Sequence, residues 1–203
     1  MLLRDEKSGP EPNDLEAIGR HLDQLNTRLG AWWNRLDEVL REQGIGPDDL
    51  VPDNKSIERA MAKIGKDPWE EVYTVLDSLC AIYVDINAAQ RQEICHLLNS
   101  KHYVLNGING YVSRNADLYR ETKDSKWVGF ALTSVIIEDG RTDYRDILMS
   151  LAYLYLTIVD VGELDPYPQF QAAAEQANGS IRDMLAHFDE ARAKELDRSW
   201  RED

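Results

Sequence analysis

Apolar residues recur along residues 14–43 at alternating intervals of three and four positions. They are Leu15, Ile18, Leu22, Leu25, Leu29, Trp32, Leu36 and Val39. This heptad pattern predicts one long α-helix with an apolar seam along one side. Trp33 and Leu40 widen the seam, which favours packing of the helix on its own domain. Because heptads alone do not identify the partner helix, a homo-oligomer formed through this segment stays an open alternative.

The remainder of the chain shows helical periodicity interrupted by Gly, Pro and Asn turns. Residues 1–13 are polar and proline-containing, which predicts a disordered N-terminus. After a linker at 44–53, residues 54–200 form a predicted helical domain without a convincing strand. The predicted helices include about 55–64, 101–121, 126–138, 143–161 and 169–199. Short connections make neighbouring helices antiparallel, so the expected fold class is all-α.

Two all-α architectures fit this pattern, each with the long N-terminal helix. The first is a multi-helix bundle, and the second is a short HEAT-like or armadillo-like stack of antiparallel helices. The stack depends on an internal repeat, in which residues 84–98 align with residues 137–151 at an offset of 53 residues. Helix pairs resemble each other for packing reasons alone, so the alignment does not decide between the two.

The longest apolar stretch runs from Ile147 to Val159 and has 13 residues, interrupted by Ser150 and Thr157. A membrane-spanning helix needs ~20 residues, so this stretch predicts a buried helix of a globular protein. No signal-peptide core follows the N-terminal methionine, and the chain has two cysteines, Cys80 and Cys95. We therefore expect a reduced, cytoplasmic protein in which both cysteines act as small core residues.

The 203-residue chain has 23 basic and 37 acidic residues, which gives a net charge of −14. An acidic surface repels phosphate groups, so the composition argues against direct binding of nucleic acid or of an anionic membrane. The same charge favours association with a basic protein partner. The sequence shows no nucleotide-binding, nucleophile-elbow or zinc-binding pattern, and no cofactor is expected.

The densest polar cluster lies at a predicted helix–turn–helix corner over residues 138–146. Asp143 and Asp146 stand at the start of a helix, where the dipole favours carboxylates, and Arg141 and Arg145 can pair with them. A capped, ion-paired turn explains this composition, and a recognition corner is the functional alternative. We expect a protein interface formed by this corner together with the two consecutive tryptophans of the N-terminal helix. Its candidate residues are Trp32, Trp33, Arg141, Asp143, Arg145 and Asp146.

A second hypothesis places Mg²⁺ at the same corner, with Glu138, Asp143 and Asp146 as ligands. The stretch DYRDILMSLAYLYLTIVDVG resembles the second metal-binding helix of all-α nucleoside-triphosphate pyrophosphatases of the MazG type. The resemblance covers about 20 residues and implies that Asp143 and Asp146 occupy the motif positions. The preceding helix lacks the Glu-x-x-Glu motif of that family.

The predicted helix 101–121 combines two glycines with two asparagines, all poor helix formers. Such local conflict marks either a close helix crossing or a binding site. The candidate residues of a polar groove are Asn106, Asn109 and Arg114.

The favoured functional hypothesis is a non-catalytic, acidic, helical interaction protein, such as an adaptor, a regulator or an immunity-type protein. Two alternatives are kept: a Mg²⁺-dependent nucleotide pyrophosphohydrolase, and an acidic mimic of nucleic acid that inhibits a DNA-binding protein.

Overall fold

The computed structural model describes residues 15–45, 54–65, 67–138, 144–176 and 179–187, except the side chains at 54 and 144–146. Within these ranges the chain is helical and contains no strand, which confirms the all-α helical bundle. The elements are α1 (Leu15–Glu42), α2 (Asn54–Ile64), α3 (Trp69–Asp85), α4 (Ala88–Asn99), α5 (His102–Leu105), α6 (Ile108–Thr122), α7 (Lys126–Glu138), α8 (Tyr144–Val161) and α9 (Pro166–Ala174). A further helical segment covers residues 180–187.

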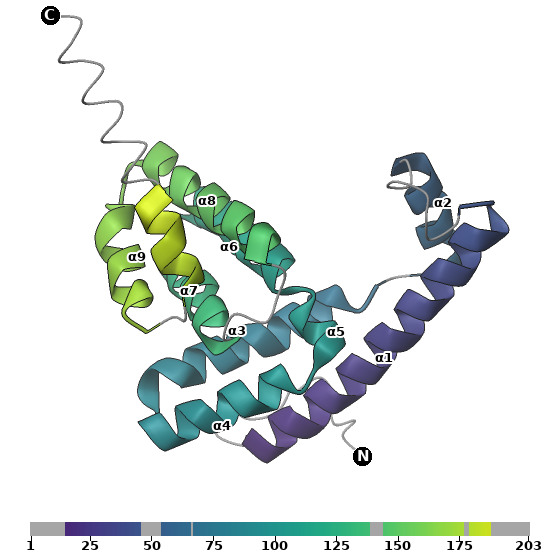
Figure 1. Cartoon of the computed structure of the whole chain (residues 1–203), viewed down its shortest axis with the longest axis horizontal. Coiled ribbons are helices and arrows are strands. Elements are labelled where there is room, and N and C mark those ends of the chain that lie inside the picture. Colours follow the sequence, from purple (N-terminus) through teal and green to yellow (C-terminus); the bar gives the residue numbers. More distant parts are fainter. Residues whose placement is uncertain (1–14, 46–53, 66, 139–143, 177–178, 188–203) are drawn as a thin grey trace, which may run out of the picture.

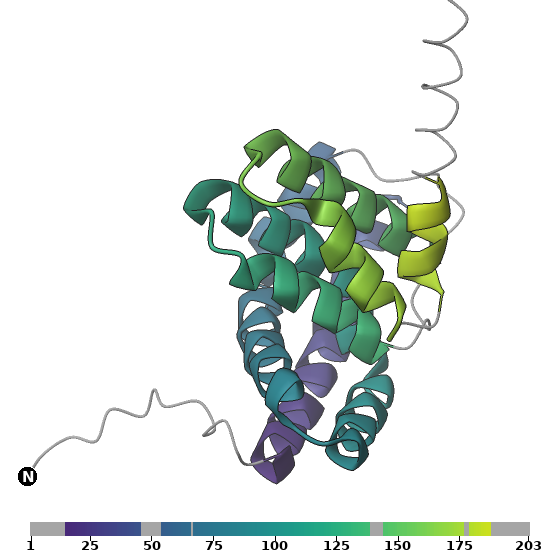
Figure 2. The same cartoon turned by 90° about the vertical axis from the view of Figure 1, so that its left-hand side faces the viewer.

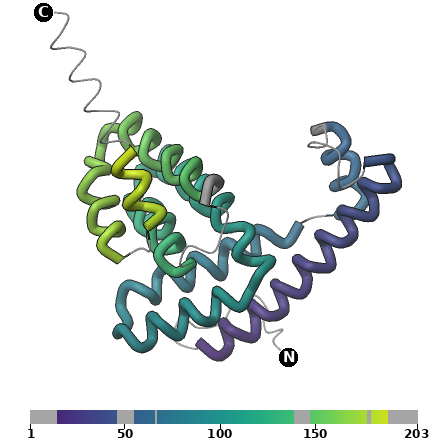
Figure 3. The backbone as a smooth tube through the Cα atoms, viewed as in Figure 1, coloured from purple at the N-terminus to yellow at the C-terminus, as the bar shows by residue number. Residues whose placement is uncertain are grey.

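The long helix α1 belongs to two packing units. Its N-terminal half lies against α3, α4 and α5, whereas its C-terminal end extends away from them and carries α2 (Figure 1 and Figure 3). The seam residues from Ile18 to Leu29 enter the main core. Leu36 and Val39 form a separate small core with Ala60 of α2. We call residues 31–45 and 54–65 the arm, and the other described residues the body.

The body consists of two groups of helices that cross each other. Helices α6, α7, α8 and α9 run across the direction of α1, α3 and α4 (Figure 2). Tyr111, Tyr119 and Phe170 are the largest fully buried side chains of this core. Cys80 is also fully buried, as expected for a small core residue, and Cys95 is half-buried.

The segment predicted as one helix over 101–121 is divided into α5 and α6. Gly107 lies at the division, where the ring of Trp69 from α3 occupies the space that a Cβ atom would need. One turn later, a Cβ at Gly110 would lie 2.6 Å from the hydroxyl oxygen of Tyr73. The two glycines therefore mark a close crossing of α6 with the aromatic side chains of α3.

The expectation of a buried helix over Ile147–Val159 is wrong for one side of α8. Ile147, Leu151, Leu154 and Ile158 are buried against the body, as the apolar pattern predicts. Met149, Leu156 and Val159 are instead 64%, 56% and 53% exposed. Neighbouring helices cover only the inner side of α8, and no described residue covers the outer side enough to bury them.

Candidate interaction surface

The outer face of α8 gathers three of the five large hydrophobic residues that the structure describes as exposed. Met149, Leu156 and Val159 follow each other at intervals of seven and three residues, so they lie on one side of the helix. The half-buried Ala152 and Tyr153 fill the intermediate turn. Contiguous exposed apolar surface of this kind is typical of protein interfaces. Val84 on α3, by contrast, is 62% exposed as a single residue.

A groove of about 350 Å³ lies beside this face, between α6 and α8. It is lined by Arg120, Tyr153, Leu156, Thr157, Val159 and Asp160. Tyr153 Oη donates a hydrogen bond to Asp117 Oδ1 of α6 (2.5 Å). Arg120 Nη1 donates to Tyr153 Oη (3.1 Å), and Arg120 Nη2 donates to Thr157 Oγ1 (3.3 Å). These polar contacts hold α6 and α8 together along the floor of the groove.

The electrostatic surroundings of the α8 face are acidic. Asp117 and Asp160 are both exposed, and Asp160 lines the groove between α6 and α8. From Asp146 through Ile181 the chain has five acidic residues and no Lys or Arg. Arg120 is the one basic residue that lines the groove, and it is engaged by the Tyr153 ring at 5.5 Å and by the contacts to α8. The hydrogen bond to the Asp117 carboxylate, together with burial, raises the pKa of the Tyr153 phenol.

The two tryptophans proposed for the interface lie on the arm. Their rings pack edge to face with centroids 5.3 Å apart. Trp33 is 38% exposed, whereas Trp32 packs against the small core of α1 and α2. Adjacent residues of a helix point about 100° apart, so the two rings have different surroundings. Their role in binding stays a prediction.

The predicted recognition corner falls largely outside the described residues. Arg141 and Asp143 lie outside them, as do the side chains of Arg145 and Asp146. Glu138 ends α7 and is 1% exposed. No group of three or more His, Cys, Asp or Glu side chains in the described part of the chain is placed to hold a metal ion. The interface at this corner and the magnesium site both stay predictions.

The polar-groove residues have different surroundings. Asn106 is exposed after α5, and Asn109 Oδ1 accepts a hydrogen bond from the backbone N–H of Gly110 (2.8 Å). Arg114 Nη1 forms an ion pair with Asp77 Oδ1 of α3 (3.3 Å). The structure therefore places Arg114 in the crossing of α3 and α6, and a binding role for the three residues stays a prediction.

Sequence reasoning did not find the cluster that surrounds Arg114. The guanidinium lies 5.6–5.9 Å from the ring centroids of Tyr73, Tyr111 and Trp127. Tyr111 Oη donates a hydrogen bond to Asp77 Oδ1 (2.6 Å), and burial raises the pKa of the Tyr111 phenol. Aromatic rings and one carboxylate thus stabilise the cation where three helices meet. The available signal was the helical spacing of Tyr73 with Asp77, but it does not identify their partner on α6.

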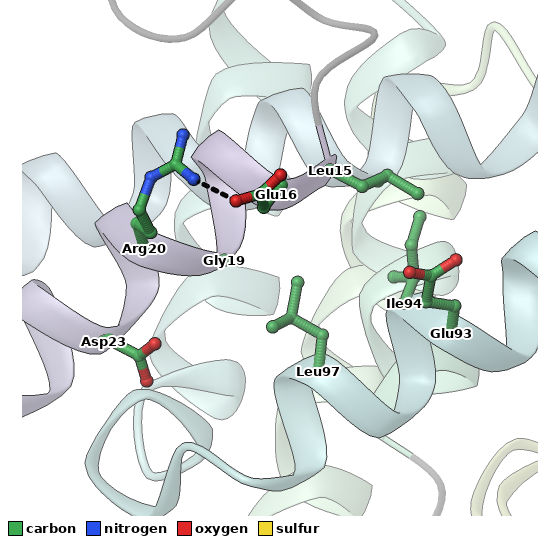
Figure 4. Close-up of a pocket in the computed structure, with 8 residues that line it drawn as sticks. All are labelled: Leu15, Glu16, Gly19, Arg20, Asp23, Glu93, Ile94 and Leu97. Carbon is green, nitrogen blue, oxygen red and sulfur yellow. Dashed lines mark hydrogen bonds and ion pairs between the residues drawn. The ribbon is translucent and has the colours of Figure 1, made fainter.

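A second pocket of about 320 Å³ lies between the start of α1 and α4. It is lined by Leu15, Glu16, Gly19, Arg20, Asp23, Glu93, Ile94 and Leu97 (Figure 4). Leu97 approaches Gly19 so closely that a Cβ there would lie 3.2 Å from its Cδ1. The basic side chain of Arg20 is paired with Glu16. This shallow site combines an apolar floor with carboxylates at its edge.

Comparison of the chain with protein-family models, with curated proteins and with solved structures found no match. The class that the fold itself defines is an all-α helical bundle with a projecting two-helix arm. None of the described helices is both long enough and apolar enough to span a membrane.

Proposed function

We propose that this protein is a non-catalytic, acidic interaction protein that binds a basic protein partner through the outer face of α8. The observation that carries the proposal is the exposure of Met149, Leu156 and Val159 on one side of a single helix. Large apolar side chains on the surface of a helix are normally covered by another element or by a partner. Here the body covers one side only, so a binding partner would bury the other.

Charge supports the same partner chemistry. The protein has a net charge of −14, and the segment that contains the apolar face has acidic residues without basic ones. Carboxylates around an apolar centre accelerate encounter with a basic protein and discriminate against acidic ones. An adaptor, regulatory or immunity-type role fits such a surface, and a cytoplasmic location is part of the proposal.

The buried seam of α1 limits which side of this helix a homo-oligomer would use. Residues from Ile18 to Val39 pack within their own chain, so the seam is already covered. A homo-oligomer through the segment 14–43 would use another side of this helix, with Trp33 as its largest exposed residue.

The proposal is tested by affinity capture from the native host with a matched pair of variants. Leu156→Glu places a charge in the centre of the face, and Val84→Glu places the same charge at an equally exposed but isolated position. We expect a stoichiometric partner with a basic binding surface that is captured by the wild type and by Val84→Glu. Leu156→Glu should lose it while retaining the helical circular dichroism spectrum. Equal capture by all three proteins contradicts the proposal.

A further inference from the structure

The hydrogen-bonding properties of the α8 face favour one secondary structure for the bound partner. All backbone groups in the interior of α8 and α6 are used within their own helices. An extended peptide on this face would bring unpaired N–H and C=O groups against apolar side chains, which is unfavourable. A partner that satisfies its own backbone avoids this loss. An α-helix does so and presents a continuous side-chain surface.

The dimensions of the face agree with a helical partner. Met149 and Val159 are ten residues apart on α8, which corresponds to ~15 Å along the helix axis. A partner helix of about three turns covers this length with anchors at i, i+3 or i+4, and i+7. The groove of about 350 Å³ beside Leu156 gives one such anchor a depression to fill.

Charge indicates how the partner helix is oriented about its axis. Asp117 of α6 and Asp160 of α8 are both exposed. Asp160 lines the groove between α6 and α8 together with Arg120, which pairs with Asp117 at 4.0 Å. Glu121 follows Asp117 by one turn of α6 and is exposed as well. Lys or Arg residues that flank the apolar stripe of the partner would therefore lie over α6.

We infer that the outer face of α8 binds a basic amphipathic α-helix, whose apolar stripe contacts Met149, Leu156 and Val159 and whose cations face Asp117 and Asp160. This inference rests on the proposed function and specifies its partner. The test uses the 203-residue chain and model peptides in place of the natural partner.

The test measures binding of labelled model peptides by fluorescence anisotropy. The probe is a peptide of about four helical turns with leucine at i, i+3 and i+7 and lysine at the flanking positions. One control peptide has the same composition in scrambled order, and another carries glutamate in place of lysine. Only the basic amphipathic peptide should bind and gain helicity on binding, and its affinity should fall with added salt.

Protein variants locate the site and separate its two components. Leu156→Glu should weaken peptide binding at least about tenfold, because it removes a central apolar contact. Asp160→Lys should weaken it roughly threefold and reduce the salt dependence, since it replaces an acidic edge charge with a basic one. Val84→Glu should leave binding unchanged. Equal binding of the scrambled or acidic peptide, or equal losses for Leu156→Glu and Val84→Glu, overturns the inference.

Two further outcomes separate this inference from the proposed function. If no basic amphipathic peptide binds while capture of a basic partner still depends on Leu156, the inference of a helical partner segment is wrong and the proposed function stands. If neither peptide binding nor partner capture depends on Leu156, the inference and the proposed function are both wrong. Sedimentation tests the alternative occupant: a wild-type dimer that Leu156→Glu abolishes would show that a second copy covers the face, and would overturn the inference.

Discussion

Helices α1 and α8 both carry apolar residues along their whole length, yet among the described residues only the apolar seam of α1 is covered. The seam of α1 runs from the main core into the small core with α2, and its other sides are mostly polar or charged. Helix α8 has no charged residue between Asp146 and Asp160, and the described residues cover it on one side only. The apolar seam of α1 is therefore covered, whereas the uncharged stretch of α8 has more apolar surface than the described residues cover.

The largest expected effect on stability comes from truncating a buried leucine, with an exposed leucine of α8 as the comparison. Leu25→Ala removes a fully buried side chain of α1, and we expect a loss of about 2–5 kcal/mol of unfolding free energy. Leu156→Ala removes a side chain that is 56% exposed and should change stability by less than about 0.5 kcal/mol. Urea denaturation followed by circular dichroism measures both. Similar losses would show that α8 is covered in solution.

An intermediate effect on stability is expected from replacing glycine with alanine at a crowded position and at an uncrowded one. Gly107→Ala would force a Cβ into the ring of Trp69, and we expect destabilisation of about 1–3 kcal/mol. Gly129 lies in α7, and a Cβ added there would meet no heavy atom of the described residues within 4 Å. Gly129→Ala should therefore stabilise the protein by roughly 0.5–1 kcal/mol through helix propensity. Thermal unfolding of the two variants should shift in opposite directions, and shifts of the same sign would contradict the crossing at Gly107.

The smallest effect concerns an exposed carboxylate at the start of α7. Asp124 Oδ1 accepts a hydrogen bond from the backbone N–H of Lys126 (3.0 Å), and this bond lowers the pKa of Asp124 below its ordinary value of 3.8. Because the folded-state pKa is depressed, the stabilisation is present above pH 3.8 and is lost as the pH falls through the folded-state pKa. We expect Asp124→Ala to reduce the difference in melting temperature between neutral and acidic solution slightly. An NMR titration of Asp124 that gives a raised pKa would contradict this cap.

Parts of the candidate sites that depend on neighbours in the sequence can be predicted from it, whereas parts that depend on contacts between distant segments cannot. Exposure of one of Trp32 and Trp33 follows from their adjacency in a helix, which is a local property. The cluster around Arg114 does not follow from the sequence, because Asp77 and Trp127 reach it from two other helices. The break between α5 and α6 escapes prediction for the same reason, since Trp69 lies 38 residues before Gly107 in the chain.

The sequence by itself determined the all-α class, the long helix α1 with its apolar seam, and the core character of Cys80. These properties depend on helical periodicity and residue polarity, which are local. Only the tertiary structure decided that α2 completes the small core of the arm and that Trp69 and Tyr73 pack on the glycines of α6. It also decided that the described residues leave one side of α8 uncovered. Residue spacing shows which sides of a helix are apolar, but the number and placement of neighbouring helices decide which of those sides are buried.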